Sequence, residues 1–126
     1  MRLPFVLLLL VSLFTACTDD VVEETPVAER LLGRWDLMRA SRNNVETTTL
    51  GSLFYDFGPD GVLGTNLLGE EQTGTYTLAD DATRVITAGV KLPLEYTIVQ
   101  HSDTTLHLRA RHEGYLFDFE LLRGER

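Results

Sequence analysis

Cys17 is the residue whose chemistry is easiest to interpret, because it is the only cysteine in the chain. It follows a basic Arg2, an apolar run over residues 5–14 and two small residues, Thr15 and Ala16. A basic start, a short apolar run and small residues before a cleavage point are typical of an export signal, and the run is too short to span a bilayer comfortably. The thiol has no cysteine partner within the chain, so covalent modification is its expected chemistry.

The sequence FTAC, which ends at Cys17, resembles the lipobox of bacterial lipoproteins. The resemblance implies that a diacylglycerol is attached to the thiol, that a signal peptide (residues 1–16) is removed, and that the new amine is acylated, for example with palmitate. It implies a lipid-anchored protein of the bacterial cell envelope, in the outer membrane and facing either the periplasm or the cell surface. An ordinary secretory signal with a chance cysteine is the alternative.

Residues 17–30 are acidic and contain no aromatic side chain, so we expect them to tether a domain to the lipid. Acidic residues directly after the lipidated cysteine also resemble the surface-export signal of Bacteroidetes lipoproteins. A solvated linker explains the same residues without a sorting role. The formal net charge of −8 argues against nucleic acid as a partner, because phosphate binding requires basic clusters.

The three histidines form no pattern that indicates catalysis or metal binding. His101 falls in a predicted turn, His107 on a predicted polar face and His112 at a strand end. No histidine or cysteine spacing matches a metal site. We therefore expect no enzymatic activity, no metal and no cofactor.

Turn residues recur at intervals of about ten residues after Gly33, which is typical of an all-β meander. The sequence predicts a short helix over 26–32 and then eight strands, at 34–42, 52–57, 62–68, 72–78, 83–88, 92–100, 104–111 and 115–123. Apolar and polar residues alternate in several of them, which indicates one buried and one solvated face. The predicted fold class is all-β, an eight-stranded antiparallel up-and-down barrel over residues 31–126.

Gly33-Arg34-Trp35 resembles the G-x-W motif of lipocalins, and the stretches LLGRWDLMRA, GTYTL and FDFELLR resemble small lipocalin-like domains of envelope lipoproteins. The resemblance implies that Trp35 closes one end of the barrel, beside Gly33, and that Arg123 packs over it. Strand geometry favours the same pairing, because the end of the last strand lies beside the start of the first. A solvated Arg123 near the C-terminus is the alternative.

Arg39 shares the alternation of Trp35 and Leu37, which predicts that it points into the barrel. Together with the inward-facing Tyr55, Tyr96 and Phe117, it would bind an amphipathic acid at the end opposite Trp35. A bulge that turns Arg39 outward, or an acidic partner inside the protein, are the alternatives.

Two functions follow from these residues. The first is binding of a small hydrophobic or amphipathic molecule at the envelope. The second is a structural or adaptor lipoprotein, whose barrel is filled and which binds another envelope protein that the sequence does not identify. Whether the barrel contains an open apolar cavity distinguishes the two.

Overall fold

The computed structural model describes residues 26–124. The predicted signal peptide, Cys17 and the tether as far as residue 25 lie outside the described residues. The described part forms one short helix, one 3₁₀ turn and nine strands. Their bounds are α1 Val27–Leu31, β1 Gly33–Arg42, β2 Val45–Thr47, β3 Phe54–Phe57, η1 Pro59–Gly61, β4 Val62–Thr65, β5 Gln72–Ala79, β6 Arg84–Ala88, β7 Glu95–His101, β8 Thr105–His112 and β9 Tyr115–Arg123.

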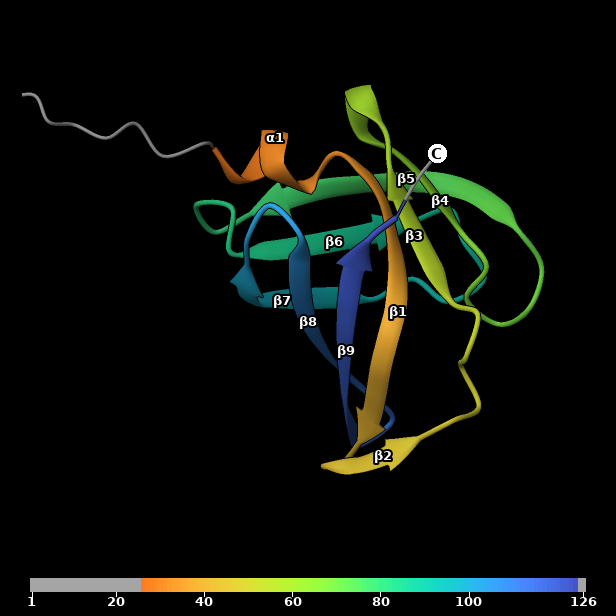
Figure 1. Cartoon of the computed structure of the whole chain (residues 1–126). Helices are drawn as coiled ribbons and strands as arrows, with labels where there is room; N and C mark the ends of the chain where they lie inside the picture. The colour runs from red at the N-terminus through yellow and green to blue at the C-terminus, as the bar shows by residue number, and fades with distance from the viewer. Residues whose placement is uncertain (1–25, 125–126) are drawn as a thin grey trace, which may run out of the picture.

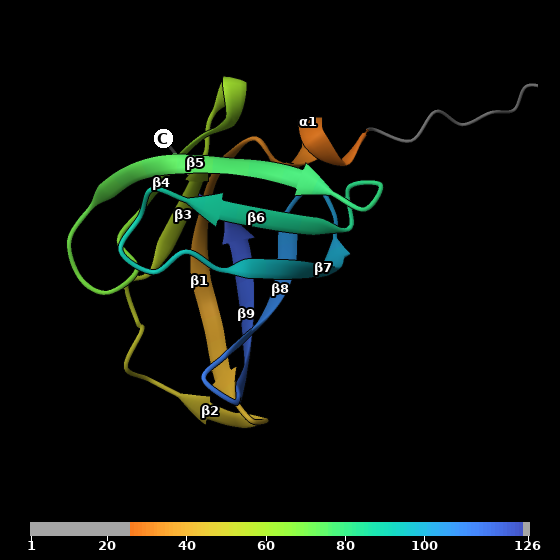
Figure 2. The same ribbon diagram turned by 180° about the vertical axis from the view of Figure 1, so that it is seen from behind.

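Eight of these strands close into an antiparallel barrel, which confirms the predicted fold class (Figure 1). From β3 to β9 each strand pairs with the next, and β1 pairs with both β3 and β9. The view from behind shows β5, β6 and β7 running across the direction of β1, β8 and β9 (Figure 2). Closure of the last strand on the first removes the exposed edges that an open sheet would have.

The short strand β2 is a feature that the sequence analysis missed. Asn43 and Asn44 both have positive φ angles, of 51° and 70°. Two consecutive positive φ angles are the geometry of a tight type I′ hairpin turn, which asparagine tolerates better than most residues. The turn folds the chain back so that Val45 lies opposite Arg42. The Asn-Asn pair was the sequence signal for this hairpin.

Several strands are shorter than predicted, and β4 and β7 differ most. β4 ends at Thr65, although a strand to residue 68 was expected, and β7 begins at Glu95, although a strand from residue 92 was expected. Pro93 explains the late start of β7, because proline has no N–H to donate to a strand ladder. Leu94, directly before β7, still exchanges hydrogen bonds with Thr87 of β6, and it borders the surface described below.

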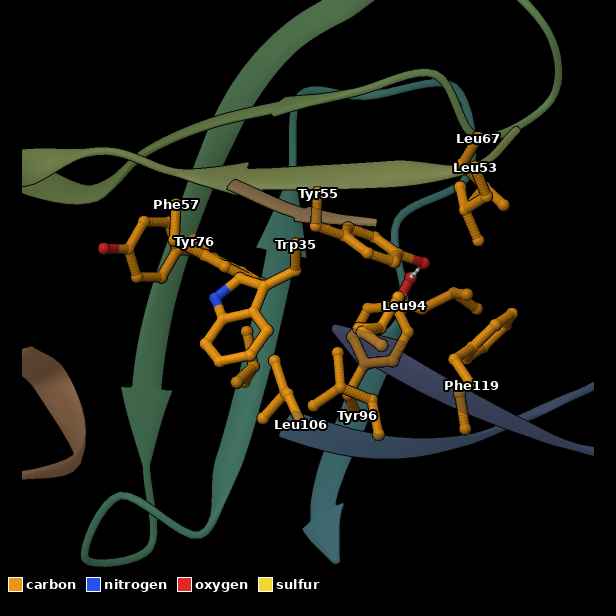
Figure 3. Packing of buried hydrophobic residues seen from close by; sticks show 14 of the residues in the cluster. Trp35, Leu53, Tyr55, Phe57, Leu67, Tyr76, Leu94, Tyr96, Leu106 and Phe119 are labelled. Atoms are coloured by element: carbon orange, nitrogen blue, oxygen red, sulfur yellow. Dashed lines mark hydrogen bonds between the residues drawn. The ribbon is translucent and has the colours of Figure 1, made fainter. Parts of the chain in front are cut away.

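Aromatic side chains fill the barrel around Trp35 (Figure 3). Trp35 and Phe57 are fully buried, and Phe57 meets Tyr76 edge to face, with 4.9 Å between the ring centroids. Tyr76 keeps its hydroxyl satisfied by donating a hydrogen bond to the Gly58 carbonyl at 2.8 Å. Aromatic pairs of this kind contribute about 0.5–1.5 kcal/mol each beyond the burial of their area. This end of the barrel is therefore packed with side chains.

Arg39 does not point into the barrel, and this part of the sequence prediction was wrong. Leu37 lies opposite Leu121 and Arg39 lies opposite Glu120, so Met38 is an extra residue in β1. Such a β-bulge reverses the alternation of every residue that follows it. The Arg39 side chain is 52 % exposed and donates to the Glu120 carboxylate at 2.9 Å and 3.2 Å.

Arg123 lies over Trp35 at the closed end of the barrel. The two residues are direct partners in the β1–β9 ladder, and the Arg123 guanidinium carbon lies 4.0 Å from the centre of the indole ring. The indole N–H donates to the Leu31 carbonyl at 2.9 Å. A guanidinium over an indole face is attracted by the electrons of the ring, an interaction of about 0.5–2 kcal/mol.

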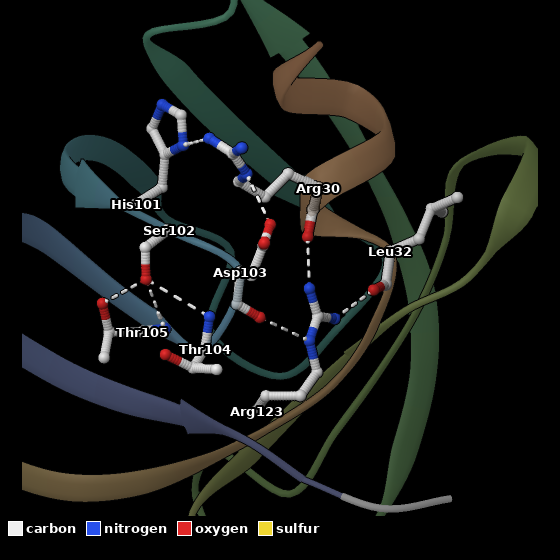
Figure 4. A network of polar contacts seen from close by, with 8 residues as sticks. All are labelled: Arg30, Leu32, His101, Ser102, Asp103, Thr104, Thr105 and Arg123. Atoms are coloured by element: carbon white, nitrogen blue, oxygen red, sulfur yellow. Dashed lines mark hydrogen bonds and ion pairs between the residues drawn. The ribbon is translucent and has the colours of Figure 1, made fainter. Parts of the chain in front are cut away.

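The guanidinium of Arg123 also links the end of α1 to the turn between β7 and β8 (Figure 4). It donates to the carbonyls of Arg30, at 2.6 Å, and of Leu32, where α1 ends, and to the carbonyl of Asp103, at 3.3 Å, between β7 and β8. The carbonyls in the last turn of a helix lack partners within the helix, so these bonds satisfy groups that the helix leaves open. Arg123 thus fastens α1 across the end of the barrel.

Gly33 is required by the position of Arg123. Its φ angle of 113° lies in a region that side-chain-bearing residues rarely adopt, and a Cβ atom here would lie 2.7 Å from Nη1 of Arg123. Both residues of the G-x-W motif therefore contact Arg123. Gly33 leaves space for the guanidinium, and Trp35 provides the ring on which the guanidinium packs.

We predict that Arg123→Ala lowers the free energy of unfolding by about 2–4 kcal/mol, because the cation–π contact and the carbonyl hydrogen bonds are lost together. The emission of Trp35, the single tryptophan, should shift to longer wavelength as water reaches the ring. Urea unfolding followed by fluorescence measures both effects. The matched control is Arg111→Ala on the exposed face of β8, where we expect less than about 0.5 kcal/mol. Equal losses in the two variants would contradict this prediction.

Candidate ligand-binding site

A pocket of about 400 Å³ opens at the end of the barrel opposite Trp35. It lies where β1 ends and β9 begins, on the far side of Tyr55 and Tyr96 from Trp35. We call it the open-end pocket. Its lining residues are Arg42, Thr47, Thr49, Leu50, Leu67, Leu68, Leu92, Leu94, His112, Phe117 and Phe119.

The walls of the open-end pocket are largely apolar. The rings of Phe117 and Phe119 lie nearly parallel, with 6.2 Å between their centroids, because alternate residues of β9 face the barrel interior. Leucines from the loops that follow β2, β4 and β6 complete the wall, among them Leu50, Leu67 and Leu92. Such a concave apolar surface with a few polar groups is typical of small-molecule sites.

Tyr55 and Tyr96 form the packed layer between the open-end pocket and Trp35. Their hydroxyl oxygens lie 2.6 Å apart and their rings meet edge to face at 5.6 Å (Figure 3). Burial raises the pKa of both phenols, that of Tyr55 well above its ordinary value, so both hydroxyls keep their protons. Both rings also pack edge to face against Phe119, which does line the pocket.

Polar groups gather at the rim of the open-end pocket. The Arg42 guanidinium lies over the Tyr115 ring, 4.9 Å from its centre. His112 lies on the same side, with Nε2 3.6 Å from the carboxylate of Glu113. These groups surround an otherwise apolar opening, an arrangement that suits a molecule with one polar end.

A second hollow, of about 530 Å³, lies in the side of the barrel between β7 and β8. β7 pairs with β8 from Thr97 opposite Arg109 onward, whereas the last residues of β8 pair only with β9 among the described strands. We call this hollow the lateral cleft. Its lining residues are Arg84, Pro93, Leu94, Glu95, Thr97, Arg109, Ala110, Arg111, His112 and Leu116.

Ion pairs hold two of the three arginines of the lateral cleft. Arg84 contacts Asp80, at 3.0 Å, and Glu95. Arg109 donates through Nε to Asp118 at 2.7 Å, and His107 lies 2.8 Å from the same carboxylate oxygen. Burial alone would raise the pKa of Asp118, but the hydrogen bonds from Arg109 and His107 more than offset it, so the pKa lies below its ordinary value. Asp118 is therefore ionised at neutral pH.

The structure brings only one of the four predicted ligand residues to the open-end pocket. Phe117 lines it, Tyr55 and Tyr96 lie in the layer behind it, and Arg39 lies outside the barrel. The cation at the rim is Arg42, which the sequence analysis did not select. In the sequence, only the position of Arg42 beside the Asn-Asn turn pointed to the open end of the barrel. Strand alternation predicts the wrong side for Arg42 unless the bulge at Met38 is known.

Within residues 26–124, no three His, Cys, Asp or Glu side chains gather closely enough to hold a metal ion. In the same range, no helix is long and apolar enough to cross a membrane.

Comparison of the whole barrel with solved structures identifies its fold. A lipocalin-like protein from Bacteroides uniformis superposes with a TM-score of 0.53 at 17 % sequence identity, over 75 % of this chain and 99 % of that one. The barrel is lipocalin-like in fold. At this level of identity the similarity concerns the fold alone. No family model and no curated protein matches the chain.

We predict that Tyr55→Phe lowers the free energy of unfolding by about 1–3 kcal/mol, because it leaves the Tyr96 hydroxyl buried without its partner. The double variant Tyr55→Phe/Tyr96→Phe removes both polar groups and should cost less than the sum of the two single changes. Urea unfolding of the four proteins completes the cycle. Additive losses would mean that the two hydroxyls do not depend on each other.

Proposed function

We propose that this lipocalin-like barrel binds a small hydrophobic or amphipathic molecule in the open-end pocket. The observation that carries the proposal is the pocket, an apolar hollow of about 400 Å³ at one end of a barrel whose other end is packed. Its size lies within the range of about 300–1,000 Å³ that is usual for small-molecule sites.

Burial of the ligand's apolar surface would supply most of the affinity, at about 25 cal/mol per Å² removed from water. Phe117, Phe119 and the surrounding leucines offer the matching surface. The rim groups Arg42 and His112 would stay near water and hold a polar end of the ligand. The proposed role is binding and not catalysis, because no nucleophile and base meet among the residues that line the pocket.

The alternative function is that of an adaptor, a lipoprotein with a filled barrel that binds another envelope protein. It becomes the better explanation if the pocket binds no small molecule. The half of the barrel around Trp35 is filled by its own side chains, as that alternative requires. The open end is not filled, and this observation favours ligand binding over a solid scaffold.

We also propose that the protein is a lipoprotein of the bacterial envelope, held at the outer membrane through Cys17. The support is the sequence of the first 17 residues, with its apolar run and the FTAC motif. A chain held by two or three acyl groups stays on a membrane durably, because each buried methylene contributes about 0.8 kcal/mol. The acidic residues after Cys17 would separate the barrel from the lipid surface.

We predict that the purified protein binds N-phenyl-1-naphthylamine, a neutral apolar dye, at micromolar concentration. Leu50→Glu should weaken binding by about tenfold or more, because a carboxylate without a partner is costly in an apolar pocket. The matched control is Leu122→Glu, on the outer surface of β9, where the leucine is 41 % exposed. Dye fluorescence gives the dissociation constants. If the unmodified protein fails to bind the dye, the adaptor function replaces the binding function.

We predict that Cys17→Ser releases the protein from the membrane fraction or blocks removal of the signal peptide. The serine hydroxyl cannot take the place of the thiol that is alkylated. Fractionation and mass spectrometry of the N-terminus measure both outcomes. Normal processing together with undiminished membrane retention would show that Cys17 is not the anchor.

A further inference from the structure

The open-end pocket and the lateral cleft share two lining residues, Leu94 and His112. One face of this pair therefore borders an apolar space, and the other borders a space with polar walls. A molecule with an apolar chain and a polar head could occupy both hollows by passing this pair.

The junction exists because the wall between β7 and β8 is incomplete. Ile98 and Thr97 pair with Leu108 and Arg109, but no pairing with β8 precedes Thr97. β8 nevertheless continues to His112, supported on its other side by β9. The strand pairing of the wall is therefore incomplete beside Ala110 and His112, both of which line the cleft.

The chemistry of the lateral cleft favours an anionic group. The Arg111 side chain forms no hydrogen bond or ion pair with another residue in the described range 26–124, and it is exposed and lines the cleft. Arg109 uses only its Nε for Asp118, so its two terminal nitrogens are without a partner among the described residues. Two guanidinium groups with open donors, two residues apart on the same face of β8, match the oxygens of a carboxylate or phosphate.

We propose that the ligand is a single-chain amphiphile with an anionic head group. Its chain lies in the open-end pocket against Phe117 and Phe119, and its head lies in the lateral cleft against Arg109 and Arg111. This inference rests on the proposed function of the open-end pocket. Arg109 and Arg111 here take the role of binding the anionic head, which the sequence had assigned to Arg39. The bulge turns Arg39 to the outside of the barrel.

Arg42 at the rim is the competing position for the head. Its guanidinium already lies over the Tyr115 ring, and it is a single cation at the mouth of the pocket. The lateral cleft offers two guanidinium groups, the Thr97 hydroxyl and a hollow large enough for a head group. We therefore place the head in the cleft, and the experiment compares the two positions.

The test uses the full, lipid-anchored protein in nanodiscs, titrated by calorimetry with dodecanoate, dodecyl phosphate and dodecanol, with empty nanodiscs as the blank. We expect both anions to bind more tightly than the alcohol. Arg111→Gln should weaken the anions by about tenfold, as expected for the loss of a charge-assisted hydrogen bond, and change dodecanol by less than about twofold. The side chain of Arg111 is exposed and without partners in the described range, so the variant should unfold at an unchanged temperature. Arg39→Gln is the matched control and should leave all three affinities unchanged.

Each other result has one meaning. If Arg42→Gln weakens the anions and Arg111→Gln does not, the head lies at the rim and the cleft assignment is overturned. If all three probes bind equally well, with or without Arg111, the proposed function stands and this inference fails. If no probe binds the unmodified protein, the proposed function itself fails. A preference for one of the two anions that is lost in Arg111→Gln would support the cleft and identify the head as carboxylate or phosphate.

Discussion

The pairing of β9 with β1 is the constraint on which the rest of this structure depends. It converts a meander into a closed barrel, and it places Arg123 directly beside Trp35. Once the guanidinium lies over the indole, it can reach the end of α1 and the turn between β7 and β8 at the same time. One side chain near the end of the chain therefore fixes the first helix, the first strand and a distant turn.

The same closure divides the barrel into two unequal halves. Near Trp35, the aromatic rings pack edge to face and leave little space. Toward the other end, β1 turns into the β2 hairpin, and its last residues pair with β2 instead of β3. Loops bearing leucines cover that end in place of strands. The hollow at the open end is a consequence of this loss of pairing.

Irregularities in the strands decide where charged side chains lie. The extra residue Met38 turns Arg39 to the surface, where it meets Glu120. β7 begins at Glu95 after Pro93, and its first two residues pair with β6 but not with β8, which leaves the end of β8 without a partner on one side. Arg111 consequently borders a cleft instead of a continuous sheet. In both cases a change of one or a few residues in strand pairing moves a cation relative to the binding pocket.

Several features of this protein followed from the sequence alone, because they depend on local patterns. The all-β class, the order of the strands and the inward position of Trp35, Tyr55, Tyr96 and Phe117 follow from turn residues and from the strict alternation of a strand. The position of Arg123 beside Trp35 followed from the antiparallel closure of eight strands. Only the tertiary structure decided the direction of Arg39, the hollow at the open end and the cleft beside β8. A bulge shifts the pairing register, and a hairpin or an early end of pairing removes a strand's partner. Sequence alternation records neither, since pairing is set by contacts between strands far apart in the chain.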